Sequence, residues 1–190
     1  MLSLLKSSYW ISRFLYIENE MDFTIEKMIP NDWDQVRSIF MEGISTGHAT
    51  FETNSNGWDK WNSSHLNNCR LVAKSEGSVL GWAALSRVSD RQVYSGIAEV
   101  SVYVAKDYHR QGVGFALLKA LIKESEDCGI WTLQAGIFPE NTNSLDLHRK
   151  LGFKQVGTRK KLGKMSYGQL AGAWRDVILM ERRSNTVGID

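Results

Sequence analysis

The chain has 190 residues, of which 43% are hydrophobic and 23% are charged, a composition typical of one globular domain with a sizeable core. The formal net charge is only +2, so bulk charge gives no argument for a nucleic-acid partner. The two cysteines, Cys69 and Cys128, are too few for a disulfide framework, and neither has the neighbours of a metal site. A reducing, cytoplasmic compartment is the simplest interpretation.

The first twenty residues are expected to precede the domain as an extension. Lys6 and Arg13 interrupt their apolar run, so neither a signal peptide nor a membrane span is predicted. The spacing is compatible with a short amphipathic helix, but we favour a flexible or loosely docked segment, with Met21 as an alternative start of the natural chain. The predicted organisation is an extension (1–20), a single domain (21–183) and a C-terminal tail (184–190).

Hydrophobic periodicity predicts alternating strands and helices. Gly129 and Gly152 follow two helical patterns and are expected to end them. In chain order we expect strands at 23–29, 71–74, 79–85, 98–105, 131–138, 153–159 and 177–182, helices around 36–44, 58–66, 112–128 and 141–151, and surface loops at 47–57, 86–96 and 163–173. An antiparallel start followed by a β-loop-α-β-α-β half predicts an α/β (α+β) domain with a mixed sheet.

The segment EVSVYVAKDYHRQGVGFALL, residues 99–118, is the most informative. A strand leads into a glycine-bearing loop, and a helix begins at once. Glycine lets the backbone approach a ligand, and the first helical N–H groups are unpaired, which suits a pyrophosphate. A P-loop would need a Lys-Ser/Thr pair, and the dinucleotide fingerprint a third glycine; both are absent. A plain strand-to-helix turn remains the alternative.

Residues 141–153 read NTNSLDLHRKLGF, a short helix followed by Gly-Phe. Together the two segments resemble the GNAT superfamily of acetyltransferases. Its acetyl-CoA loop has the form [Q/R]-x-x-G-x-[G/A], and its later signature is N-x-x-[A/S]-x-x-x-[Y/H]-x-x-x-G-[F/Y]. Both occur here, in that order. The resemblance implies the GNAT fold, a mixed central sheet flanked by about four helices, and acetyl-CoA as co-substrate with no metal.

The match is closer to the phosphinothricin and methionine-sulfoximine acetyltransferases, and the sequence also looks like arsinothricin acetyltransferases. That branch pairs a Glu-x-x-x-Tyr-Val strand (99–104) with a histidine before Gly-Phe and ends in Gly-x-Trp-x-Asp (172–176). The resemblance covers about residues 21–183. It implies N-acetylation of a small amino-acid-like molecule, with detoxification or antibiotic resistance as the purpose, by a homodimer that has no nucleic-acid or membrane partner.

The sequence departs from the family at three points. His109 stands where relatives prefer Gln or Arg, and the loop before Trp174 is longer than usual. Arg87 and Arg91 lie near the acceptor segment, but not where relatives carry arginine. The identity of the acceptor therefore stays open. A silent acyl-CoA-binding module and a protein or peptide acetyltransferase are the competing functions.

Acetyl transfer needs a neutral amine, a polarised thioester carbonyl and a protonated leaving thiol. Glu99 is the predicted base, directly or through water, and burial should raise its pKa toward the working pH; a solvated strand-end glutamate is the alternative. His148 falls where many members place a tyrosine that protonates the thiolate; a core-facing histidine is the alternative.

The remaining predicted site residues fall into two groups. Arginine matches two-oxygen anions, so the acceptor is expected to carry an anionic head such as a phosphinate, although solvated loop arginines are equally compatible. For acetyl-CoA we expect contacts from Val102, Tyr103, Val104, Arg110, Gln111, Gly112, Val113, Gly114, Phe115 and Asn141, with a β-strand N–H as oxyanion donor, and for the acceptor from Phe51, Arg87, Arg91 and Tyr94.

Overall fold

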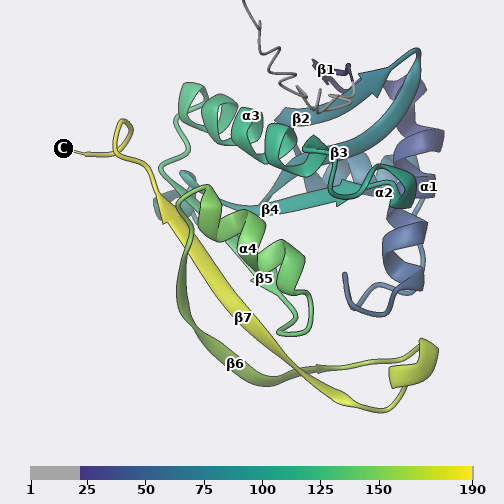
Figure 1. Ribbon diagram of the computed structural model, residues 1–190. Coiled ribbons are helices and arrows are strands. Elements are labelled where there is room, and N and C mark those ends of the chain that lie inside the picture. Colours follow the sequence, from purple (N-terminus) through teal and green to yellow (C-terminus); the bar gives the residue numbers. More distant parts are fainter. Residues whose placement is uncertain (1–21, 190) are drawn as a thin grey trace, which may run out of the picture.

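Seven strands form one β-sheet in the order β1-β2-β3-β4-β5-β7-β6 (Figure 1). The computed structural model describes residues 22–189, so the predicted extension 1–20 lies outside the described residues. The strands are β1 (Thr24–Lys27), β2 (His65–Ser75), β3 (Ser78–Arg87), β4 (Ile97–Val104), β5 (Thr132–Ile137), β6 (Lys154–Lys164) and β7 (Trp174–Arg183), and the helices are α1 (Trp33–Ser45), α2 (Trp58–Ser64), α3 (Val113–Asp127) and α4 (Thr142–Lys150). The predicted mixed sheet with four helices is confirmed.

Strands β4 and β5 form the parallel pair in this otherwise antiparallel sheet. They pair over Ile97–Glu99 and Thr132–Gln134, whereas β4 continues to Val104 and β5 to Ile137. Beyond the paired residues the two strands diverge, and the sheet opens into a V at their carboxyl ends (Figure 1). Ligands of open α/β sheets bind at the carboxyl ends of the strands, so this opening positions the candidate site.

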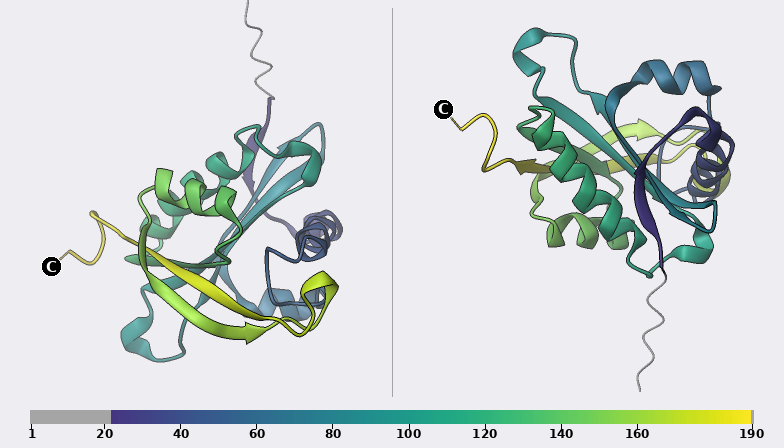
Figure 2. Two further views of the ribbon diagram at one scale, coloured as in Figure 1. Left: turned by 60° about the horizontal axis from the view of Figure 1, so that its bottom comes forward. Right: turned by 90° about the horizontal axis from the view of Figure 1, so that it is seen from above.

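The helices cover both faces of the sheet, α3 and α4 on one side and α1 and α2 on the other (Figure 2). Leu117 and Leu121 of α3 are fully buried between that helix and the sheet, as their helical spacing predicts. On the α1 face, Trp82 stacks on Tyr103 with ring centroids 4.8 Å apart. The two packed layers hold β4 rigidly between them, which fixes the strand that lines the V.

Two predicted elements have different bounds in the structure. The helix predicted at 58–66 ends at Ser64, and Leu66 lies in β2 and packs toward the α3 core. The surface loop predicted at 163–173 is shorter, because β6 runs to Lys164, and Met165 is 1% exposed. Met165 packs against Phe138, so burial in the tertiary structure outweighs the glycine-rich composition of this segment.

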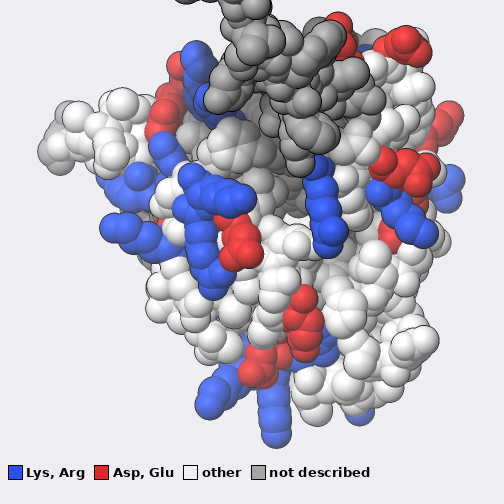
Figure 3. All heavy atoms as spheres, in the orientation of Figure 1, with Lys and Arg blue, Asp and Glu red and all other residues white. Residues whose placement is uncertain are grey.

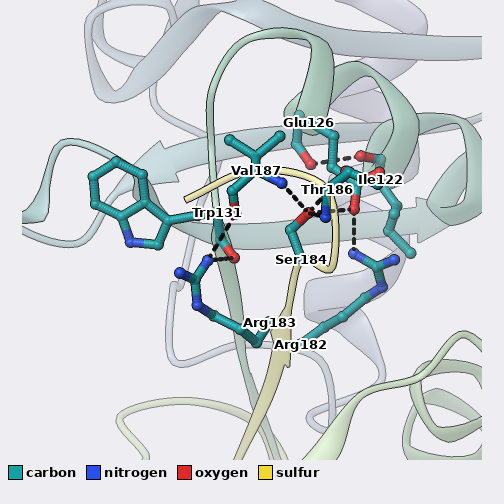
Figure 4. A network of polar contacts seen from close by, with 9 residues as sticks. Ile122, Glu126, Trp131, Arg182, Arg183, Ser184, Thr186 and Val187 are labelled. Atoms are coloured by element: carbon teal, nitrogen blue, oxygen red, sulfur yellow. Dashed lines mark hydrogen bonds and ion pairs between the residues drawn. The ribbon is translucent and has the colours of Figure 1, made fainter. Parts of the chain in front are cut away.

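The segment after β7, predicted as a tail, packs against the end of α3 (Figure 4). Ser184 Oγ donates a hydrogen bond to Glu126 Oε1 at 2.9 Å, and the Arg182 guanidinium pairs with the same oxygen at 2.9 Å. Arg183 donates to the carbonyl of Trp131 at 2.8 Å. The contacts of Ser184 extend the ordered domain beyond the predicted boundary at residue 183.

Candidate active site

The loop between β4 and α3 presents backbone N–H groups at the mouth of the V. Gly112 has φ +82°, and a Cβ there would meet nothing within 4 Å. No side chain caps the helix that follows, so the first-turn amides of Val113, Gly114 and Phe115 lack intrahelical partners. Unpaired amides at the positive end of a helix dipole form a site for an anion.

Side chains of the loop support this backbone from behind. The His109 Nε2 atom lies 2.9 Å from the carbonyl oxygen of Val104, and Gln111 Nε2 donates to the Asp107 carbonyl at 2.7 Å. A Cβ on Gly114 would lie 3.4 Å from Val104 Cγ2 and 3.5 Å from a methyl group of α4. The predicted cofactor loop therefore lies directly against the carboxyl end of β4, and the His109 side chain contacts the strand backbone there.

Glu99 occupies the last paired position of β4 and points to the α1 face, because its neighbours Ala98 and Val100 are buried in the α3 core. Its Oε1 lies 3.6 Å from where a Cβ on Gly136 would stand, so the missing side chain at 136 leaves room beside the carboxylate. Partial desolvation raises the pKa of Glu99, and Arg159 opposes that rise. A raised pKa suits a base at neutral pH.

Aromatic and hydroxyl side chains form a wall beside Glu99. Burial raises the pKa of Tyr103, so its hydroxyl stays protonated, with the Thr50 side chain as hydrogen-bond partner. Tyr167 Oη donates to the Thr50 carbonyl at 2.8 Å. Phe51 packs edge-on against Phe138 at 4.8 Å, in a cluster shared with the β6–β7 hairpin. Phe51 and Tyr167 therefore belong to one wall; the acceptor contact of Phe51 stays a prediction, and no motif in the sequence pointed to Tyr167.

A buried arginine holds the α1–α2 loop across this wall. The Arg175 side chain is 4% exposed and donates to the Gly47 carbonyl at 3.0 Å and to Glu140 Oε2 at 2.9 Å. Its guanidinium lies 4.1 Å from the centroid of the Phe138 ring. Arg175 thus ties the loop to β7 and to the segment that follows β5, and it is one of the residues that the Gly-x-Trp-x-Asp motif brackets.

Asn141 uses both polar atoms of its side chain for protein contacts. Its Oδ1 accepts from the Ser144 N–H at 3.2 Å, which caps α4, and its Nδ2 donates to the His48 carbonyl at 3.2 Å. The structure thus gives Asn141 a structural role that sequence reasoning missed, and its contact with a cofactor stays a prediction.

His148 lies in the interior beneath α4 and is 4% exposed. Its Nδ1 is 2.8 Å from the Ser144 carbonyl, which can only accept, so Nδ1 carries the proton. Burial lowers the pKa of His148, and Nε2 has no partner among residues 22–189. The neutral ring therefore offers an acceptor at Nε2. This tautomer does not fit the predicted role of proton donor to a thiolate, because its one proton is held by a backbone carbonyl.

Acid should destabilise the fold below about pH 6.5. Burial lowers the pKa values of His65 and His148 from 6.5. Between the lowered folded-state pKa and 6.5 the unfolded chain binds more protons than the folded one. In that pH range the free energy of unfolding therefore decreases as the pH is lowered, by up to about 1.4 kcal/mol per pH unit for each histidine. Urea unfolding at about pH 7.5 and about pH 5.5 measures this. The His148→Gln and His65→Gln variants should each lose less of their free energy of unfolding between these two pH values. The same loss as in the wild type in both variants would contradict the role of the two histidines.

Arg87, one of the predicted acceptor residues, does not share a face of the sheet with Glu99. Arg87 is the cross-strand partner of Ala98, which faces the α3 core, and partners share a face. The prediction for Arg87 is thus corrected: its backbone position belongs to the face opposite Glu99. Arg91 and Tyr94 contact each other, with the guanidinium 5.2 Å from the ring centroid, at the end of the sheet where β4 begins.

Comparison with known proteins gives a consistent assignment. Residues 33–153 match the model of the acetyltransferase (GNAT) family. A phosphinothricin N-acetyltransferase from Alcaligenes faecalis is 41% identical over 117 residues, 60% of this chain and 56% of that protein. An L-methionine sulfoximine/L-methionine sulfone acetyltransferase from Pseudomonas paraeruginosa is 33% identical over 111 residues, 58% of this chain and 62% of that protein. The matched part thus spans less than two thirds of these relatives' length.

A solved structure shares the fold over most of its length. It is a GNAT superfamily phosphinothricin acetyltransferase from Sinorhizobium meliloti in complex with acetyl-CoA, with a TM-score of 0.78 and 26% identity, covering 90% of this chain and 92% of that one. Within residues 22–189, no group of three or more His, Cys, Asp and Glu side chains could hold a metal ion. No helix in that part of the chain is long and apolar enough to cross a membrane.

Proposed function

Because the chain belongs to the GNAT family of acetyltransferases, we propose that it transfers the acetyl group of acetyl-CoA to the amino group of a small amino-acid-like acceptor. The observation that carries the proposal is the arrangement of Glu99 and the Gly112 loop at opposite ends of β4, where the strand departs from β5. An anion site and a carboxylate with a raised pKa then flank one strand. The names of the phosphinothricin and methionine-sulfoximine relatives support this acceptor class.

Acetyl-CoA would lie in the V, with its pyrophosphate on the amides of residues 110–115. One edge of β4 is paired with β3, and Tyr103 lies opposite Trp82 in that ladder. Along Val102–Val104 the edge toward the V has no β5 ladder, so backbone groups there are free to hold the pantetheine and the thioester carbonyl. A strand N–H aimed at the developing oxyanion would stabilise the tetrahedral intermediate.

The chemistry then follows from these positions. Glu99, directly or through water, takes a proton from the acceptor ammonium. The neutral amine attacks the thioester carbonyl carbon, the attacking nitrogen loses its second proton to water, the amide bond forms, and the carbon–sulfur bond breaks to release CoA thiolate. The thiolate takes a proton from water or from the protonated Glu99, because His148 holds its own proton on the Ser144 carbonyl. Nε2 of His148 is left as a hydrogen-bond acceptor.

An acceptor screen tests the proposal. The purified protein is mixed with acetyl-CoA and phosphinothricin, methionine sulfoximine, arsinothricin, the common amino acids and short peptides, and released CoA and the acetylated product are measured. Turnover of free amino acids with much lower kcat/KM for peptides is expected. A preference for peptides would indicate a protein acetyltransferase. Binding of acetyl-CoA without turnover of any amine would indicate a silent acyl-CoA-binding module.

We also propose that the protein is a cytoplasmic homodimer with a detoxifying role. Strand β6 is an edge strand, and large apolar side chains on the β6–β7 hairpin are exposed: Val156 by 60%, Leu162 by 41% and Trp174 by 57%. Exposed apolar groups on an open sheet edge favour pairing with a second copy. Both cysteines are free thiols, as a reducing compartment would keep them. Light scattering that gives the chain mass of 21.5 kDa at micromolar concentration would contradict the dimer.

A further inference from the structure

Cross-strand neighbours place Glu99 of β4 and Arg159 of β6 on the same face of the sheet. The point where a Cβ on Gly136 would stand lies 3.6 Å from Glu99 Oε1 and 3.3 Å from Val177 Cγ1. Val177 is in turn the direct cross-strand partner of Arg159. Direct partners share a face of the sheet, so Glu99, Gly136, Val177 and Arg159 line one face, with a glycine gap at the centre.

Arg159 is available to a ligand on this face. Its side chain is exposed, and no ion pair or hydrogen bond joins its guanidinium to another side chain in the part of the chain that the structure describes. Basic side chains project from the lower edge of the molecule (Figure 3), where β6 runs in Figure 1.

The backbone around Arg159 is set by a bulge. The register of β6 against β7 shifts between Arg159 and Gly163, and Lys161 has φ +48°. Asp176 Oδ1 accepts the Lys161 N–H at 2.7 Å, which holds the bulge in place. Bulges re-aim side chains beside functional sites. Gly163 packs under the Phe51 ring, and a Cβ on Gly163 would lie only 2.8 Å from that ring. The same bulge therefore joins Arg159 to the acceptor wall.

We propose that Arg159 binds the α-carboxylate of the acceptor while Glu99 faces its amino group. A carboxylate and a guanidinium on either side of a glycine gap are complementary to a zwitterion, whose ammonium and carboxylate occupy neighbouring atoms of one small molecule. A guanidinium fork matches two carboxylate oxygens. This assignment rests on the proposed function and replaces the predicted acceptor arginine Arg87, whose position belongs to the opposite face.

The test compares methionine sulfoximine, whose only carboxylate is the α-carboxylate, with its α-carboxamide. Arg159→Ala should lower kcat/KM for the acid about tenfold or more, chiefly through KM, and hardly change it for the amide. Arg159→Lys should restore part of the loss. Lys164→Ala is the matched control, since Lys164 pairs with Trp174 and so faces away from the Arg175–Val177 side of the hairpin. For each acceptor, kcat/KM of the variant is divided by kcat/KM of the wild type, so the different basicities of the two amines cancel. Equal losses for both acceptors, or no loss for either, would overturn the proposal.

The pH profile gives a second readout that a structural role would not move. Arg159 on β6 is the charged group that acts on Glu99. On the wall, the Tyr103 hydroxyl is acted on by Glu99 and also by Glu52 and Tyr167. Because the Arg159 charge opposes the rise of the Glu99 pKa, Arg159→Ala should shift the acid limb of kcat/KM to higher pH. An unmoved limb would count against the pairing.

Calorimetry separates this inference from the proposed function. Methionine sulfoximine is titrated into the wild type and Arg159→Ala, each saturated with CoA. If the wild type binds it in an Arg159-dependent way but turns over no amine, the proposed function fails and the carboxylate site stands. If the wild type shows neither turnover nor binding, both fail.

Discussion

Replacing Glu99 with glutamine should lower kcat/KM for the amine acceptor by about 10²- to 10⁴-fold, the usual contribution of a general base. Glutamine keeps the size of the side chain and its contact with the glycine gap at Gly136, but it cannot take a proton. The variant should bind acetyl-CoA normally, because Glu99 lies at the end of β4 away from the Gly112 loop.

The matched control is Glu181→Gln. Glu181 stands in the same row of the sheet, opposite Gln134, which is itself opposite Glu99. This control removes one carboxylate from the same face two strands away and should leave kcat/KM nearly unchanged. In the wild type, activity should fall as pH falls through the pKa of Glu99, which partial desolvation raises above its ordinary value of 4.5. A Glu99→Gln variant that retains the same activity and acid limb would remove Glu99 from the reaction.

The loop and helix of the proposed cofactor half were predictable because they are contiguous in the chain. A strand, two glycines and a helix of spaced leucines follow one another within residues 99–118, and each has a local physical meaning. Gly112 adopts the left-handed conformation that favours glycine, and Leu117 and Leu121 are buried. Local spacing therefore sufficed for the loop, the helix and the order of the neighbouring elements.

The proposed acceptor half was not predictable, because it depends on register between distant strands. Arg87 is close to Glu99 in space along the β3–β4 ladder, but its partner is Ala98, one residue away, and a shift of one residue reverses the face. Arg159 reaches the same face as Glu99 only through the pairing of β6 with β7 and of β7 with β5. No spacing within the sequence encodes those registers.

The interior of α4 shows a different limit. The N-x-x-S-x-x-x-H pattern places Asn141, Ser144 and His148 correctly on one short helix, yet it cannot say which atoms they use. The Ser144 N–H donates a hydrogen bond to Asn141 Oδ1, and the Ser144 carbonyl accepts one from the Nδ1–H of His148. Hydrogen-bond partners, rather than residue types, decide that His148 is an acceptor.

Gly112→Asp should raise the KM for acetyl-CoA about tenfold or more, whereas Gly112→Asn should raise it far less. Both residues tolerate the left-handed backbone better than other side chains, both have the same shape, and a Cβ at 112 meets open space. They differ by one negative charge at the N-terminus of α3. If the pyrophosphate lies on the amides of residues 113–115, that charge repels it and competes for the same helix dipole; a tenfold weakening corresponds to about 1.4 kcal/mol.

The comparison of these two variants isolates charge from backbone strain. Any strain that a side chain causes at φ +82° is common to both, so the ratio of their KM values reports the electrostatic effect. That ratio should shrink as salt is added, because screening weakens interactions between exposed charges, and the acceptor KM should stay the same in both. Equal KM values for acetyl-CoA in the two variants would place the pyrophosphate elsewhere. The opening between β4 and β5 would then hold the thioester without the α3 N-terminus, and the glycine at 112 would serve only the turn.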